Sequence, residues 1–141
     1  MKADKTYVLD SYAILAYLDG EEAAIQVTQI LTEAQQGACR AAMSVINLGE
    51  VLYITEREKG LPQAHEALAM IEQLALEILP ASRQIVLDAA HIKANYPVSY
   101  ADAFVIATAL ELKGVVVTGD TEFDKVKQIV QIEWIPNNGS S

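Results

Sequence analysis

The feature that most constrains the fold is a run of four β-branched residues, Val115-Val116-Val117-Thr118. A short continuous run of this kind predicts a strand that is buried on both faces, because a strand with one wet face would alternate apolar and polar residues. Gly114 ends the helical segment before the run, and Gly119-Asp120 forms a turn after it. The sheet that contains this strand must therefore carry helices on both sides.

The rest of the chain alternates strands and helices. Strands are expected at 6–9, 39–43, 77–80, 115–118 and 129–134, and helices at 11–18, 25–37, 45–59, 61–76, 83–95, 100–113 and 121–126. Ser44, Ser82 and Ser99 are expected to cap the helices that follow them. The pattern predicts an α/β fold, a three-layer α/β/α sandwich around a mostly parallel sheet. We expect this fold to form one domain over residues 1–135, followed by a polar tail at 136–141.

Charge and cysteine content exclude several classes of protein. The net charge of −9 is far from the basic surface of a duplex-binding module. A single cysteine, Cys39, cannot form an internal disulfide, which fits a reducing cytoplasm. The longest apolar run, Tyr12 to Leu18, is far shorter than the roughly 20 residues of a membrane-spanning helix. We expect a cytoplasmic protein that is not integral to a membrane.

Two acidic residues follow strands directly. Asp10 comes directly after the strand at 6–9, and Asp120 follows the strand at 115–118 after a single glycine. In open α/β sheets, ligands bind outside the carboxyl ends of the strands, so both side chains are candidates for one site. Each also has a simpler interpretation, as the N-cap of the next helix for Asp10 and as a turn residue for Asp120.

Two further acidic residues lie on helices among apolar neighbours. Glu50 has Ile46 and Ile54 one turn away on either side, which predicts a carboxylate held rigidly within an apolar face. Asp102 also has apolar residues one turn away, but it stands three residues after Ser99, as in a capping box. Solvent exposure would explain Glu50, and capping alone would explain Asp102.

Four carboxylates gathered at one place need a cation, because like charges repel. A site with only oxygen ligands suits Mg²⁺ or Mn²⁺. Such an ion can activate a water and stabilise charge on phosphorus, so the chemistry indicated is phosphodiester hydrolysis.

The order of these motifs resembles that of the PIN-domain ribonucleases over nearly the whole chain. It is closest to the small bacterial VapC-like toxins of toxin–antitoxin pairs. The stretches that carry the resemblance are Tyr7-Val8-Leu9-Asp10-Ser11, Ser44-Val45-Ile46-Asn47-Leu48-Gly49-Glu50-Val51, Ser99-Tyr100-Ala101-Asp102-Ala103 and Val117-Thr118-Gly119-Asp120-Thr121-Glu122-Phe123.

The resemblance implies a function and a set of site residues. It implies a Mg²⁺- or Mn²⁺-dependent endoribonuclease that cuts single-stranded RNA, held in check by a cognate antitoxin and forming a homodimer. The acids that it assigns to the metal are Asp10, Glu50, Asp102 and Asp120. Ser11 and Thr118 take supporting roles, orienting carboxylates or phosphate.

Two alternatives remain open from the sequence. One is a non-catalytic regulatory module similar to a phosphoacceptor receiver, although a receiver places its acids on strand ends and here two lie on helices. The other is a PIN-like domain with a housekeeping role in RNA processing. His65 and His91 have no nucleophile at a spacing that would pair with them, and Cys39 is expected in the core.

Overall fold

The computed structural model describes residues 5–137. Its strands are β1 (Thr6–Leu9), β2 (Arg40–Ser44), β3 (Glu77–Leu79), β4 (Val115–Thr118) and β5 (Gln131–Trp134). Its α-helices are α1 (Ser11–Asp19), α2 (Ala24–Gln35), α3 (Val45–Lys59), α4 (Leu61–Glu72), α5 (Arg83–Asn95) and α6 (Tyr100–Leu112), and a 3-10 helix, η2, spans Thr121–Val126. The expected tail at 136–141 lies mostly outside the described residues.

The five strands form one sheet in the order β3-β2-β1-β4-β5, and every neighbouring pair is parallel. The register places Val8 of β1 opposite Ala42 of β2 and Val116 of β4. From β1 the chain builds outward to β2 and β3, and then returns to the other side of β1 for β4 and β5. The expected α/β/α sandwich with a parallel sheet is confirmed.

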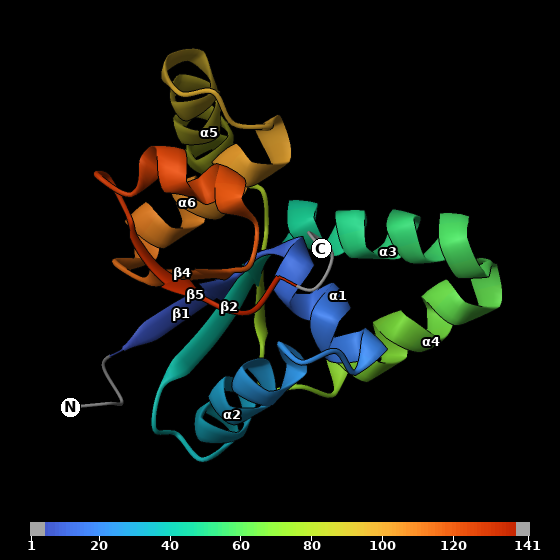
Figure 1. The fold of residues 1–141 in the computed structure, drawn as a ribbon. Coiled ribbons are helices and arrows are strands. Elements are labelled where there is room, and N and C mark those ends of the chain that lie inside the picture. The colour runs from blue at the N-terminus through green and yellow to red at the C-terminus, as the bar shows by residue number, and fades with distance from the viewer. Residues whose placement is uncertain (1–4, 138–141) are drawn as a thin grey trace.

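Side chains of the central strands alternate between two hydrophobic cores. Leu9 and Val117 enter the core formed with α1 and α2, whereas Val8 and Val116 enter the core formed with α5 and α6. Helices therefore cover both faces of the sheet (Figure 1). All four residues of β4 are buried, as the apolar run predicts.

The three expected serine caps are present. Ser44 Oγ accepts a hydrogen bond from the backbone N–H of Ile46 at the start of α3, and Ser82 Oγ accepts one from Ile85 in α5. Ser99 Oγ accepts one from Asp102 in α6. These local bonds explain why the first residues of the three helices could be predicted.

Several boundaries differ from those expected. β2 runs one residue later than expected, from Arg40 to Ser44. α4 ends at Glu72 instead of residue 76, because the chain must turn there to bury Leu76 and enter β3. β5 begins only at Gln131, since the backbone N–H groups of residues 129 and 130 bond back to Val126.

The helices α3 and α4 form a hairpin that extends away from the sheet (Figure 1). Gly60 joins them with a φ of 97°, a value that L side chains rarely adopt. No helix among residues 5–137 is long and apolar enough to cross a membrane.

Candidate active site

The topology brings two of the four acids together at the centre of the sheet. Asp10 follows β1, Asp120 follows β4, and these two strands are neighbours. The chain adds β2 and β3 on one side of β1 and then β4 and β5 on the other, so the strand order reverses between β1 and β4. At such a point a parallel sheet opens a crevice at its carboxyl edge.

Asp10 is the most deeply buried of the four acids, at 3% exposure. Its Oδ1 accepts a hydrogen bond from the backbone N–H of Ala13 (2.8 Å), so it does cap α1. Its Oδ2 accepts a second one, from the hydroxyl of Thr118 (2.5 Å). The pKa of Asp10 is raised to about 7, mainly by burial and to a lesser extent by the charges of Asp102 and Asp120, against the lowering effect of these two bonds.

Thr118 links the ends of β1 and β4. Its hydroxyl donates to Asp10 and accepts from the backbone N–H of Asp120 (2.9 Å), and the side chain is completely buried. The bond to Asp10 joins residues 108 positions apart in the chain. Thr118 therefore orients the Asp10 carboxylate and the backbone before Asp120 together.

Asp102 lies in the first turn of α6 and is half-buried. Its backbone N–H donates to Ser99 Oγ, so the expected cap is present. The charges of other acids also affect the pKa of its carboxylate. The pKa of Asp102 is raised to about 6, mainly by burial and also by the charges of Asp120 and Glu50. Capping does not account for this coupling between carboxylates.

Glu50 is half-buried on α3, and it is supported differently from what the sequence predicts. Ile46 and Ile54 are themselves only half-buried. The Glu50 carboxylate instead accepts a hydrogen bond from Asn47 Nδ2 (3.1 Å), which also donates to the carbonyl of Ala101 on α6 (3.1 Å). The sequence analysis did not single out Asn47 as a candidate for the site. The signal that could have indicated it is its position one turn before Glu50, on the helix face that carries the isoleucines.

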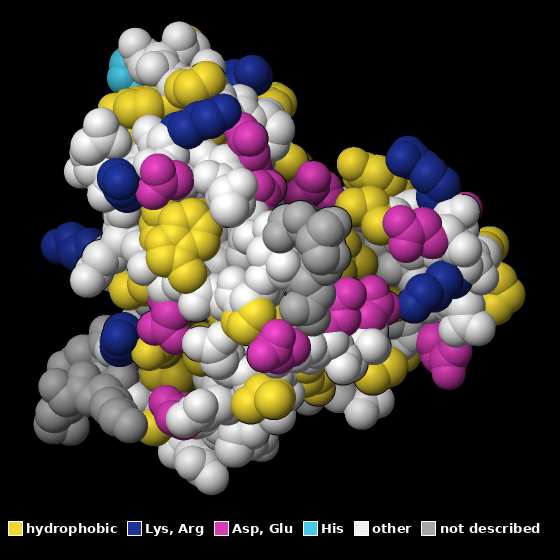
Figure 2. Space-filling model, viewed as in Figure 1, with side chains coloured by type: hydrophobic (Ala, Val, Ile, Leu, Met, Phe, Trp, Pro, Cys, Tyr) yellow, Lys and Arg dark blue, Asp and Glu magenta, His cyan; other side chains and the backbone are white. Residues whose placement is uncertain are grey.

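Asp120 and Ser11 complete the set. Asp120 is half-buried, and its Oδ1 accepts from the backbone N–H of Glu122 (2.9 Å), which makes it the N-cap of η2. Ser11 is the half-buried first residue of α1, next to Asp10. Acidic side chains are visible in the notch between α3 and the layer formed by α5 and α6 (Figure 2).

The PIN domain family model matches residues 7–129, which is most of the chain and includes all four acids. The chain belongs to the PIN domain family. This membership decides against the receiver-like alternative.

Solved structures agree with the PIN assignment. A chain of the VapBC2 complex of Rickettsia felis, bound to a promoter DNA fragment, aligns with a TM-score of 0.71 at 18% identity, covering 92% of this chain and 98% of that one. A chain of the DNA-bound VapBC complex of Salmonella typhimurium aligns with a TM-score of 0.71 at 22% identity, covering 92% and 97%. The Mycobacterium tuberculosis toxin VapC20 aligns with a TM-score of 0.70 at 15% identity, covering 94% and 100%. At these identities the likeness establishes the fold, and no curated protein matched by sequence.

The donor set of this PIN domain fits a hard divalent cation in chemistry and charge. All four candidate side chains are carboxylates, and two of them have a raised pKa that a nearby cation would lower. Within residues 5–137, no three carboxylate, imidazole or thiol groups already converge as metal ligands do. A bound cation would therefore draw these carboxylates closer together than they lie in this structure.

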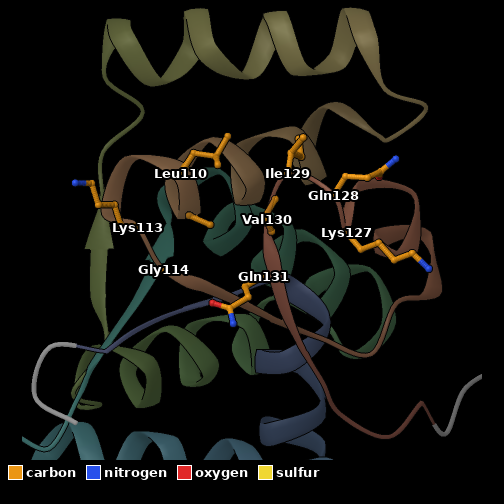
Figure 3. A pocket seen from close by; sticks show the side chains of 9 residues that line it. Leu110, Lys113, Gly114, Lys127, Gln128, Ile129, Val130 and Gln131 are labelled. Carbon is orange, nitrogen blue, oxygen red and sulfur yellow. The ribbon is translucent and has the colours of Figure 1, made fainter. Parts of the chain in front are cut away.

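A cavity of about 440 Å³ lies at the opposite edge of the sheet, near the start of β5 and the end of α6. Figure 3 shows Lys113, Lys127, Gln128 and Gln131 around it. Its lining includes two lysines and no carboxylate. His65 and His91 are exposed, and Cys39 is buried, as expected.

Proposed function

We propose that this PIN domain is a metal-dependent endoribonuclease that hydrolyses phosphodiester bonds in single-stranded RNA. The observation that carries the proposal is the electrostatic coupling of Asp10, Asp102, Asp120 and Glu50, which come from four separate elements. Carboxylates kept together at a cost in repulsion indicate a site built for a cation. Asp10, Glu50, Asp102 and Asp120 would hold Mg²⁺ or Mn²⁺.

The divalent ion would supply a nucleophilic water and neutralise charge on the phosphate. The chain's own residues supply position. Thr118 and the N–H of Ala13 hold both oxygens of Asp10, and Asn47 holds Glu50. Ser11, the residue after Asp10, would orient a carboxylate or a phosphate oxygen.

We further propose that the protein is the toxin of a toxin–antitoxin pair. The structural neighbours include chains of VapBC complexes, and VapC20 is a toxin that cleaves the sarcin–ricin loop. These parallels support a cognate antitoxin for this chain. A homodimer and a cytoplasmic location belong to the same proposal and follow from the resemblance to VapC-like toxins. A housekeeping role in RNA processing is the alternative, and no feature of residues 5–137 favours it.

Two exposed tyrosines beside the acids support an unpaired RNA substrate. Tyr53, at 50% exposure, is one turn beyond Glu50, and the Arg57 guanidinium lies 5.1 Å from the centre of its ring. Tyr100, at 45% exposure, immediately precedes Ala101, whose carbonyl is bonded to Asn47. Exposed aromatic rings stack on unpaired bases, and stacking is suited to a protein whose net charge of −9 opposes RNA binding.

Tyr53→Ala is expected to weaken binding of a short unstructured RNA by about tenfold, because one base would lose its stacking partner. Fluorescence anisotropy with a labelled RNA, in an Asp10→Asn background that prevents cleavage, measures this. Tyr53→Phe keeps the ring and should bind like the parent. Equal binding by Tyr53→Ala and the parent would remove Tyr53 from the RNA surface.

The function itself is tested by metal removal. Incubated with total bacterial RNA, the protein should cleave in Mn²⁺ or Mg²⁺, stop cleaving in EDTA, and recover when Mn²⁺ is added back. Zn²⁺ should be dispensable, since no nitrogen or sulfur ligand belongs to the proposed site. Undiminished cleavage in EDTA would contradict the metal-dependent mechanism.

A further inference from the structure

We propose that Asn47 is a positioning residue for divalent-cation binding, because it holds Glu50 of α3 next to the first turn of α6. The inference rests on the proposed function, and it assigns a role to a residue outside the four acids. It is carried by the contacts, the burial and the unbalanced hydrogen bonding of this one amide.

The Asn47 amide connects the two helices that carry Glu50 and Asp102. Its Nδ2 donates to Glu50 Oε1 and to the carbonyl oxygen of Ala101, each at 3.1 Å. Ala101 directly precedes Asp102. A single NH₂ group therefore bonds to the Glu50 side chain and to the backbone next to Asp102. The carboxylates of Glu50 and Asp102 repel each other, and a donor group shared between their helices opposes their separation.

Asn47 is not the residue that stability alone would favour at this position. Its side chain is completely buried, and its Oδ1 has no hydrogen-bond partner among the described residues. A buried acceptor without a partner costs about 1–3 kcal/mol. Leucine has the same number of side-chain heavy atoms and no polar group, so it would avoid this cost. Both acceptors of Nδ2 have other partners available: water reaches Glu50, and the Ala101 carbonyl lies within a helix.

Retaining an amide at such a cost is typical of residues that serve a site. Groups that hydrogen-bond to ligating carboxylates commonly change metal affinity by about 10–100-fold when they are replaced. Asn47 has the geometry of such a group, since its donor contacts Glu50 directly and its side chain is completely buried.

The test compares Mn²⁺ affinity with thermal stability in the full chain. Asn47→Leu should unfold at the same temperature as wild type or higher without metal, yet bind Mn²⁺ at least about tenfold more weakly by isothermal titration calorimetry. Asn47→Ser, which cannot reach Glu50, should weaken Mn²⁺ binding similarly and serves if the leucine variant misfolds. Thr55→Val, another buried polar position on α3, is the matched control and should bind Mn²⁺ normally.

A double mutant separates positioning from a general packing effect. If Asn47 acts through Glu50, Asn47→Leu should weaken Mn²⁺ binding much less in a Glu50→Gln background, and fully additive effects would overturn the proposal. Wild-type affinity in both Asn47 variants, with binding lost in Asp10→Asn, would overturn the role of Asn47 and leave the proposed function intact. Absence of Mn²⁺ binding by wild type would overturn both.

Discussion

Asp10→Asn is expected to stabilise the metal-free protein while reducing RNA cleavage by about three orders of magnitude or more. Asparagine keeps an oxygen for the Ala13 N–H and places an amide against the Thr118 hydroxyl, which can accept. The substitution therefore removes a buried charge without removing the cap. The melting temperature above pH 7, in EDTA, should rise by about 5 °C.

The same substitution has a defined pH dependence. The pKa of Asp10 is about 7 in the folded protein, whereas the ordinary value for aspartate is 3.8. Between pH 3.8 and pH 7 the folded state therefore holds a proton that the unfolded state has lost. The contribution of Asp10 to the free energy of unfolding therefore falls as pH rises from about 4 to about 7, and stays low above that. The difference corresponds to at most about 4 kcal/mol. Asp10→Asn should flatten this part of the stability profile.

Asp124→Asn is the control for Asp10→Asn. Asp124 is exposed on η2 and pairs with Lys127, so its loss should change neither cleavage nor the pH profile appreciably. A marked drop in melting temperature for Asp10→Asn in EDTA would show that Asp10 serves α1 mainly as a cap.

Glu50→Gln is expected to slow RNA cleavage by about two orders of magnitude. Glutamine can still accept the hydrogen bond from Asn47, so shape and contact are preserved and only the charge is lost. Mn²⁺ affinity should fall in parallel. The reason is that a neutral amide oxygen is a weaker ligand than a carboxylate for a hard cation.

Glu56→Gln changes an exposed acid on the same helix and should cleave at nearly the wild-type rate. Comparison of the two variants separates the effect of losing the carboxylate at position 50 from the effect of removing one negative charge from α3. Equal rates for wild type and Glu50→Gln at saturating Mn²⁺ would identify Glu50 as a surface residue with no part in the reaction.

Much of the fold follows from local sequence. The serine caps at Ser44, Ser82 and Ser99 act within three residues, and the burial of Val115–Thr118 follows from an apolar run with no polar alternation. Such signals depend on neighbours in the chain, so they can be recognised without tertiary contacts. Where a boundary depended on packing between distant segments, as at the end of α4, the expectation was wrong by a few residues.

For the site, the sequence alone determined which acids follow strands and which lie on helices among apolar residues. Only the tertiary structure decided how they are held. The hydroxyl of Thr118 reaches Asp10 across 108 positions, and the amide of Asn47 reaches Ala101 across 54. Neither pairing leaves a periodic signal in the chain, because each depends on two elements packing side by side: β1 beside β4, and α3 against α6. The burial that raises the pKa of Asp10 arises from the same packing, and so it too is a property of the folded protein.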